Sequence, residues 1–295
     1  MDALRASYGG ASSDPDSDSD SNRAISARQP PSTSNYNPTQ TASTSLPPPP
    51  LALLETPNSF GAFDCLPAEQ PRRVRSFPHV VGNYALHVYI PVCIPSLPRK
   101  EMVQFLRKVT ALVPGLHVVD IDVPLNSLFK DDNKFEQVAL GREFHISLGR
   151  TVPIRLHQRD SVVTMLRQKL QSQRRYWIDF TRWVVFVNDD CTRSFLSMEV
   201  IAAGLTEITK QIEAVNEVYK LHNLLEFYKD PRPHISVAWA LGDVGDVMTR
   251  VVEEETKRCA TTGVLSRKHI FTCKFGGIMC RVGKKTYEIC KIQEE

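Results

Sequence analysis

The sequence lacks an uninterrupted apolar stretch of the roughly 20 residues that a membrane-spanning helix needs. Its first twenty residues hold acidic residues and serines where a secretory leader would hold an apolar run. The remaining composition, 42% hydrophobic and 23% charged, is ordinary for a globular protein with a substantial core. We therefore expect an intracellular protein that does not act at a membrane.

Paired cysteines are also missing. The seven cysteines are scattered without a C-x-x-C pair, and an odd number in a chain of this length does not fit a disulfide framework. Cys273, Cys280 and Cys290 come nearest to a metal pattern, but their spacings match no common zinc signature. These features predict reduced structural thiols, no metal site and no cofactor.

The chain has no large excess of either charge. A formal net charge of +3 is too small to indicate attraction of the whole surface to nucleic acid. The first fifty residues hold five Asp against three Arg, so the rest of the chain is the more basic part. This distribution is compatible with a polyanionic substrate and does not require one.

Apolar residues are scarce over residues 12–50, which consist almost entirely of Ser, Asp, Asn, Thr, Gln and Pro. Such a segment buries too little apolar surface to offset the entropy of ordering, so residues 1–50 are predicted to be a disordered tail. Residues 51–78 are predicted to be a linker, with a short basic trio at Arg72, Arg73 and Arg75. A folded domain is expected over residues 79–295.

Strands and helices alternate irregularly in this domain. β-Branched and aromatic residues predict strands at 84–92, 116–123, 143–148, 183–187, 194–201, 270–275, 278–282 and 287–292, and one that starts at His234. Apolar residues at helical spacing predict helices around 102–112, 160–173, 205–219 and 244–258. Short links between strands favour an α+β fold of antiparallel sheet with helices outside. The element order before His145 is repeated before His234, which predicts two similar lobes.

One short motif occurs twice, as His145-Ile146-Ser147 and His234-Ile235-Ser236. Successive side chains of a strand point to opposite faces, so each copy presents an imidazole and a hydroxyl together and buries its isoleucine behind them. One His-x-Ser is near chance expectation among eight histidines, whereas two identical copies on predicted strands are not. We interpret the other histidines as structural: His79, His87, His117, His157, His222 and His269.

Two imidazoles that face one another suit the cleavage of an RNA phosphodiester. That reaction moves one proton off a nucleophile and another onto a leaving oxygen, and histidine exchanges protons near neutral pH. The two serines can donate hydrogen bonds to non-bridging phosphate oxygens. If the nucleophile is a ribose 2′-hydroxyl, which only RNA supplies, the first product is a 2′,3′-cyclic phosphate.

The paired triplets resemble the 2H phosphoesterase superfamily, and their surroundings are similar to the phosphodiesterases that trim the 3′ end of U6 small nuclear RNA. The closer similarity rests on residues 143–148, on the turn that holds Asn188, Thr192, Arg193 and Phe195, and on residues 227–239 with Gly242-Asp243. It covers about residues 79–295 and leaves the N-terminal tail outside.

The resemblance implies a bilobal, pseudo-two-fold symmetric fold with two antiparallel sheets that face a central cleft. It implies 3′ to 5′ removal of terminal nucleotides, mostly uridines, from U6 small nuclear RNA in the nucleus, without an obligate protein partner. His145 and His234 would be the acid and base, and Ser147 and Ser236 the phosphate ligands. The family pattern assigns His234 as base for the 2′-hydroxyl and His145 as acid for the 5′-oxygen.

The resemblance also implies a set of substrate contacts. Tyr228 matches the position that stacks a terminal base, and an aromatic face does this with little base selectivity. The other predicted contacts line the nucleotide pocket, several through backbone groups: Ile146, Asp189, Asp230, Pro231, Arg232, Pro233 and Ile235. Possible phosphate contacts are Arg150, Arg193, Lys229 and Arg232.

Three positions depart from the family pattern. Arg232 and Pro233 precede His234 where small and aromatic residues are more usual, and Asp189 stands where an amide is common. The resemblance therefore predicts the reaction type and leaves the base preference open.

Two other functions fit the same residues. One is a cyclic phosphodiesterase or RNA end-healing enzyme of the same superfamily, and the other is a non-catalytic RNA-binding module. The sequence also leaves open whether the product ends in a cyclic phosphate or a 3′-phosphate.

Overall fold

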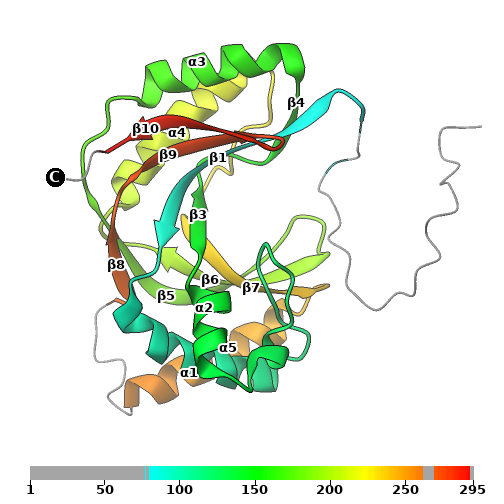
Figure 1. Ribbon diagram of the computed structural model, residues 1–295, viewed down its shortest axis with the longest axis vertical. Coiled ribbons are helices and arrows are strands. Elements are labelled where there is room, and N and C mark those ends of the chain that lie inside the picture. Colours follow the sequence, from blue (N-terminus) through cyan, green and yellow to red (C-terminus); the bar gives the residue numbers. More distant parts are fainter. Residues whose placement is uncertain (1–76, 78–79, 262–268, 293–295) are drawn as a thin grey trace, which may run out of the picture. The chain divides into compact units, whose positions relative to one another are not determined.

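The structure is a computed structural model that describes Phe77 and residues 80–261 and 269–292. The predicted tail at 1–50, the linker at 51–78 apart from Phe77, and the predicted start of the domain at His79 lie outside these residues. Within the described residues the fold is α+β, with two antiparallel five-stranded sheets (Figure 1). The predicted fold class is confirmed.

The first sheet, called sheet A here, has β1 at its centre. β9 pairs with one edge of β1, and β3 and β4 pair with successive parts of the other edge. β10 completes the sheet on the far side of β9. The strands are β1 (Asn83–Cys93), β3 (Glu143–Ser147), β4 (Val152–Arg155), β9 (Gly277–Val282) and β10 (Lys285–Lys291).

The second sheet, sheet B, runs in the order β2-β7-β6-β5-β8. β2 is so short that it covers only Ala238 and Trp239 on the outer edge of β7. The His234 end of β7 is therefore not covered by β2. The strands are β2 (His117–Val118), β5 (Trp177–Val187), β6 (Arg193–Val200), β7 (His234–Leu241) and β8 (Phe271–Lys274).

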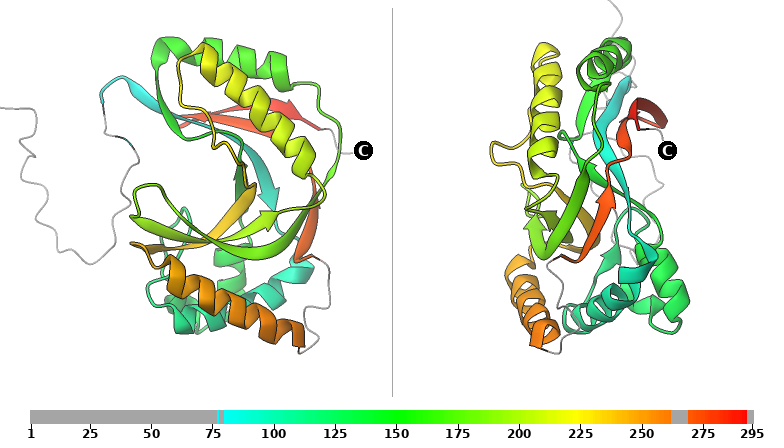
Figure 2. Two further views of the ribbon diagram at one scale, coloured as in Figure 1. Left: turned by 180° about the vertical axis from the view of Figure 1, so that it is seen from behind. Right: turned by 90° about the vertical axis from the view of Figure 1, so that its left-hand side faces the viewer.

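The helices fall into two groups (Figures 1 and 2). Helices α3 and α4 pack on each other, and α3 also contacts β9 and β10 of sheet A. Helices α1, α2 and α5 form the other group, in which α5 packs on β5 and β6 of sheet B. The bounds are α1 (Ser96–Leu112), α2 (Asp132–Leu140), α3 (Arg159–Leu170), α4 (Leu205–Leu221) and α5 (Gly245–Thr261), with 3₁₀ turns η2 (Leu125–Leu128) and η3 (Leu156–Gln158).

The two lobes are not successive stretches of chain. Sheet A takes strands from both ends of the domain, whereas sheet B takes β2 and the run from β5 to β8. The prediction that each lobe offers one triplet is confirmed, because β3 belongs to sheet A and β7 to sheet B. The lobes are interleaved, however, so neither could be cut from the sequence as one segment.

One predicted strand is wrong. Residues 116–123 were expected to be extended, but only His117 and Val118 form a strand. Asp120 and Asp122 have φ angles of 70° and 54°, in the left-handed region, so the chain turns back on itself there. This turn proves important because it holds Asp120 beside the first triplet.

One α-helix and one strand were not predicted. Helix α2 begins after Asp131, whose carboxylate accepts a hydrogen bond from the backbone N–H of Lys134, and ends before Gly141. Strand β4 has only four residues and pairs with the start of β1. Both are short, so neither produced a clear periodicity.

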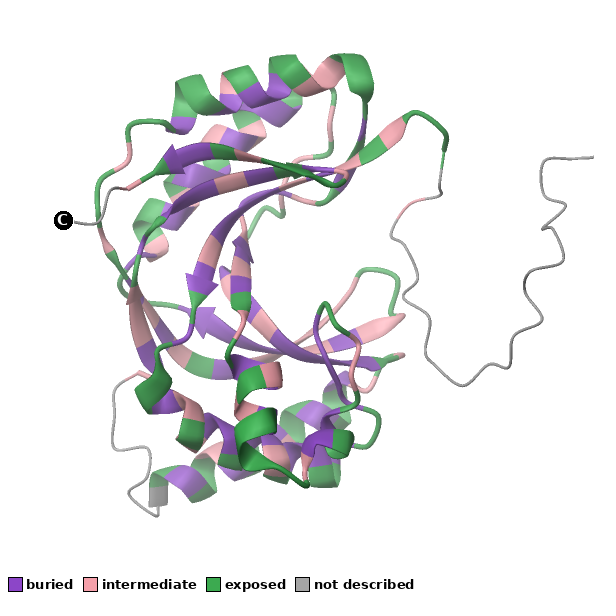
Figure 3. Cartoon of the chain, viewed as in Figure 1, coloured by how far each residue is buried: buried purple, intermediate pink, exposed green. Residues whose placement is uncertain are grey.

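A single hydrophobic core joins the two sheets and the helices. Helix α1 contributes Met102, Phe105, Leu106 and Val109 from one face, as its spacing predicted. Buried and less buried positions alternate along β3 and β4, whereas β6 and β7 each contain a run of consecutive buried residues (Figure 3). No helix in the described residues has the length and apolarity to cross a membrane. Among the described residues, Cys93, Cys191, Cys273, Cys280 and Cys290 are free thiols.

Candidate active site

The two His-Ile-Ser triplets lie on neighbouring edges of the two sheets. β3 forms an edge of sheet A, and it packs against β7 of sheet B (Figure 1). Both triplets alternate as predicted: the His and Ser side chains are half-buried, and Ile146 and Ile235 are fully buried. The two imidazoles are near enough for His145 to act electrostatically on His234.

His234 is held in a defined tautomer by the backbone. Its Nδ1 lies 2.7 Å from the carbonyl oxygen of Arg232. A carbonyl only accepts, so Nδ1 carries the proton and Nε2 of the neutral ring is the acceptor. Burial lowers the pKa of His234, with a smaller lowering from His145, against raising contributions from the Arg232 carbonyl and Glu199. The ring is therefore set up as a neutral proton acceptor.

His145 has the opposite electrostatic setting. Its Nδ1 lies 3.9 Å from Oδ2 of Asp120, the residue that the left-handed turn after β2 brings to the site. A nearby carboxylate stabilises the charged imidazolium form of a histidine. Arg142 shares the same carboxylate oxygen at 3.4 Å. The charged ring is the form that can donate a proton.

Each serine of the triplets has a partner on the adjacent strand. Ser147 Oγ lies 3.0 Å from Nε2 of His87 on β1, and Ser236 Oγ lies 3.0 Å from Oγ of Ser197 on β6. Ser197 is fully buried and sits directly opposite Ser236 in the strand register. The two hydroxyls are thus each fixed by one neighbouring side chain.

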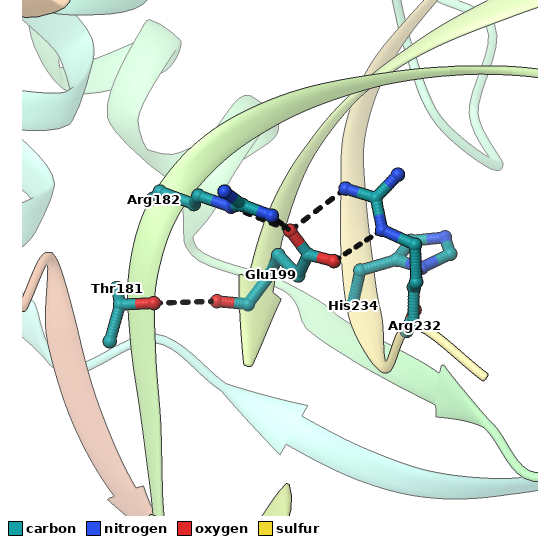
Figure 4. A network of polar contacts seen from close by, with 5 residues as sticks. All are labelled: Thr181, Arg182, Glu199, Arg232 and His234. Carbon is teal, nitrogen blue, oxygen red and sulfur yellow. Dashed lines mark hydrogen bonds and ion pairs between the residues drawn. The ribbon is translucent and has the colours of Figure 1, made fainter. Parts of the chain in front are cut away.

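A buried carboxylate organises the strand next to His234 (Figure 4). Glu199 lies opposite His234 in the register and accepts hydrogen bonds from Arg182 at 2.7 Å and from Arg232 at 2.6 and 2.9 Å. Burial raises the pKa of Glu199, but the hydrogen bonds and charges of the two arginines outweigh it and lower the pKa overall. Arg232 also covers the ring of Phe186, which in turn stacks on His234 with 4.1 Å between centroids.

A second cluster joins two predicted substrate contacts. The hydroxyl of Tyr228 lies 3.3 Å from a carboxylate oxygen of Asp189, and Arg150 binds that carboxylate at 2.8 Å. The Arg150 guanidinium also covers the Tyr228 ring at 3.8 Å from its centroid. Arg150 follows Ser147 by three residues, so its backbone can be at most about 10 Å from that of Ser147.

The chain matches, over residues 47–290, the model of a family described as HVSL, an uncharacterised conserved protein. This match spans most of the chain. The chain belongs to the HVSL family.

Curated relatives of this HVSL-family chain carry a more specific name. It is 32% identical to U6 snRNA phosphodiesterase 1 of Mus musculus over 176 residues, which are 60% of this chain and 57% of that protein. It is 33% identical to the protein of the same name from Danio rerio over 59% of this chain and 55% of the relative. The match thus spans little more than half of each relative. The resemblance to U6 RNA phosphodiesterases that the motifs predicted is confirmed.

Two solved structures match the chain with low sequence identity and low TM-scores. Usb1 of Kluyveromyces marxianus is 13% identical with a TM-score of 0.47, over 70% of this chain and 97% of that one. LigT of E. coli in its apo form is 8% identical with a TM-score of 0.38, over 72% and 99% of the two chains.

The remaining predicted residues of this HVSL-family chain occupy different settings. The side chains of Ile146 and Ile235 are in the core, so only their backbone atoms face the site. Pro233 is buried, Pro231 is half-buried, and Asp230 is exposed. Arg232 is bound to Glu199, and Arg193 lies near the rings of Phe195 and Trp239. Their roles in binding substrate stay predictions.

Several site residues were missed by sequence reasoning. His87 was interpreted as structural, yet its ring touches both His145 and Ser147. Asp120, Phe186 and Glu199 were not singled out. His87, Phe186 and Glu199 come from β1, β5 and β6, and Asp120 comes from a turn, so only the folded structure reveals that these four residues reach the triplets. The described residues include no group of three or more His, Cys, Asp or Glu side chains placed to hold a metal ion.

Proposed function

We propose that this protein is a 3′ to 5′ RNA exonuclease that trims the 3′ oligouridine end of U6 small nuclear RNA by acid–base transesterification. The observation that carries the proposal is the contact between two His-Ile-Ser strands, β3 and β7, whose histidines have opposite electrostatic settings. His234 presents a neutral acceptor nitrogen. His145 lies beside the carboxylate of Asp120.

The proton transfers follow from these settings. Nε2 of His234 removes the proton from the 2′-hydroxyl of the penultimate nucleotide, and the resulting oxygen attacks the adjacent phosphorus. The bond from phosphorus to the 5′-oxygen of the last nucleoside breaks, and His145 protonates that oxygen. The products are a shortened RNA with a 2′,3′-cyclic phosphate and a free nucleoside. Water could then open the cyclic phosphate to a 3′-phosphate with the roles reversed: His145 would take a proton from the water, and His234 would protonate the leaving 2′-oxygen.

The hydroxyls supply the electrostatic part of the reaction. Ser147 and Ser236 donate hydrogen bonds to the non-bridging oxygens, whose negative charge grows as the 2′-oxygen attacks. The two histidines carry the protons, so we propose that the reaction needs no metal ion. Tyr228, which is 45% exposed, offers a ring on which the terminal base can stack.

The choice of substrate rests on similarity to the relatives named U6 snRNA phosphodiesterase 1. For trimming of U6 small nuclear RNA, we propose a uridine-rich 3′ end as the substrate and the nucleus as the place of action. We propose that the site residues bind the RNA without an obligate protein partner.

The deciding experiment is mass determination of the 3′ ends formed from a U6-like oligonucleotide with a uridine tail and free 2′- and 3′-hydroxyls. Stepwise shortening is expected, with loss of at least about 10²-fold in rate for His145→Ala and for His234→Ala. A matched RNA with a 2′-deoxy penultimate nucleotide should resist cleavage, because it lacks the nucleophile.

Four outcomes would contradict the proposal. Turnover that both alanine variants retain would show that the two histidines do not carry the reaction. Binding of the RNA without turnover by the wild-type protein would indicate a non-catalytic RNA-binding module. Activity only on preformed cyclic phosphates would indicate a cyclic phosphodiesterase. Inhibition by a chelator that added metal reverses would exclude the metal-free mechanism.

A further inference from the structure

His87 projects from β1 into the space between the histidine and the serine of the first triplet. Its Nε2 lies 3.0 Å from Ser147 Oγ. Its ring meets that of His145 edge to face, with 4.9 Å between centroids, and stacks on Tyr89 at 5.0 Å. Two aromatic neighbours and one hydrogen bond thus fix the position of the ring.

The His87 ring is neutral at physiological pH. Its pKa is lowered to about 3, and burial is the largest cause; the charges of His145 and Arg281 also lower the pKa, against a raising contribution from Asp120. Arg281 lies opposite His87 in the register of β1 and β9. A second imidazolium beside His145 would be repelled, so His87 is unsuited to be the proton donor of the reaction.

A neutral imidazole can bind a serine hydroxyl in two ways. If Nε2 accepts, the serine proton points at His87, and only oxygen lone pairs remain for the substrate. Lone pairs repel a non-bridging phosphate oxygen. If Nε2 carries the proton and donates it, the hydroxyl hydrogen of Ser147 is free to point at the phosphate.

We propose that His87 is a positioning residue: as the Nε2–H tautomer it donates to Ser147 Oγ and so aims the Ser147 hydroxyl proton at the phosphate. This inference rests on the proposed function and adds to it a residue outside the two triplets. Ser197 holds the corresponding place beside Ser236 in sheet B, as a hydroxyl instead of an imidazole. The hydroxyl of Ser147 is therefore positioned by an imidazole, and that of Ser236 by another hydroxyl.

Kinetics of four variants on uridine-tailed RNA test the proposal. Ser147→Ala should lower kcat about 10²-fold, as loss of one donor to a developing oxyanion does, and His87→Ala should lower it by about tenfold or more. KM should stay within about twofold, and the pH at which activity rises and falls should not move. His87→Gln, which keeps an N–H donor, should recover part of the loss.

The double variant separates positioning from a general structural role. His87→Ala combined with Ser147→Ala should be no slower than Ser147→Ala alone, because His87 acts through that hydroxyl. Losses that multiply, or a His87→Ala variant with wild-type kcat, would overturn the proposal. If His87→Ala does not fold, the same comparison is made with His87→Gln and Ser147→Ala.

A measurement without RNA keeps this inference separate from the proposed function. Nitrogen-15 NMR of the histidine rings should show His87 as a neutral Nε2–H tautomer that does not titrate between pH 8 and 5. Ser147→Ala should shift its Nε2–H signal, and Ser236→Ala should not. An Nδ1–H tautomer would overturn the inference even if the RNA is trimmed. If the RNA is not trimmed, the proposed function fails while the NMR result still decides the state of His87.

Discussion

His145 and His234 are both followed by Ile and Ser in the sequence, but they have different partners at Nδ1. The partner is a carboxylate for His145 and a backbone carbonyl for His234. The first arrangement stabilises a charged ring, whereas the second fixes the tautomer of a neutral one. Two identical tripeptides therefore acquire different proton chemistry from the chain around them.

The pH dependence of cleavage should reflect this difference. His234 must be neutral to accept a proton, so the rise of kcat/KM with pH, its acidic limb, should follow deprotonation of this ring. Because burial lowers the pKa of His234, this acidic limb should lie below the ordinary histidine value of 6.5. The measurement is kcat/KM on uridine-tailed RNA from pH 4.5 to 8.

The variant Glu199→Gln provides a second test of the acidic limb assigned to His234. The negative charge of Glu199 raises the pKa of His234, so its removal should move the acidic limb to still lower pH. A limb above pH 6.5 in the wild type, or a shift to higher pH in the variant, would contradict the role of His234 as a buried neutral base.

His87 should make stability depend on pH. The unfolded chain takes up a proton on His87 below about pH 6.5, whereas the folded chain does so only near pH 3. The contribution of His87 to the free energy of unfolding is therefore fully present above pH 6.5 and is lost as the pH falls toward 3. Between pH 7 and 5 this one group should lower the free energy of unfolding by about 2 kcal/mol.

Urea unfolding at pH 7 and pH 5 measures the effect. His87→Gln should reduce the difference between the two pH values, and His157→Gln should not, because the His157 side chain is exposed. Equal pH dependence in wild type and His87→Gln would show that the His87 ring is not buried as a neutral group.

The sequence identified the two triplets because repetition within one chain can be seen without a structure. It could not identify His87, which has no repeated counterpart and reaches Ser147 only through the register of β1 with β3. Asp120 was missed for a related reason. It lies in a segment predicted as a strand, and only the left-handed φ angle of its backbone directs it toward His145.

At the scale of elements, Glu199 joins β5, β6 and the segment before β7. Its side chain is 3% exposed and binds Arg182 and Arg232, which are 54% and 45% exposed. Burial of one carboxylate is compensated by two guanidinium groups, both of which retain contact with water. Removal of the carboxylate charge should therefore loosen two strands and the start of a third together.

Glu199→Gln should destabilise the fold by about 1–3 kcal/mol, less than for a fully buried pair because both arginines are half-exposed. The midpoint of urea unfolding measures this. Glu217→Gln is the matched control, because Glu217 pairs with Lys169 at the surface of α3 and α4. An equal decrease in the free energy of unfolding in Glu199→Gln and Glu217→Gln would mean that Glu199 has no special structural role.

Most elements were predictable because their patterns are long. The spacing of apolar residues predicted α1 and α4, and alternation predicted β1 and β3. Helix α2 depends on a local cap at Asp131 instead of a long apolar stripe, and β4 depends on its partner β1. Short elements whose stability comes from a cap or a partner strand leave little periodicity to read.

At the scale of the whole molecule, the two sheets are interleaved along the chain. Repetition of element order predicted two lobes, but it could not show that β9 and β10 return to sheet A after β8 has joined sheet B. Which strands pair depends on long-range contacts that local patterns do not contain. Because both sheets share one core, they are expected to unfold together.

The tryptophans allow a direct test of this coupling. Trp177, Trp183 and Trp239 all lie on strands of sheet B. Leu86 lies on β1 of sheet A and is fully buried. Leu86→Ala should lower the free energy of unfolding by about 2–5 kcal/mol. Urea unfolding followed by tryptophan fluorescence and by far-UV circular dichroism should give the same decrease. Both signals should give one coincident urea midpoint, lowered equally from wild type. A fluorescence midpoint that stays at the wild-type value while circular dichroism shows two steps would mean that sheet B folds without sheet A.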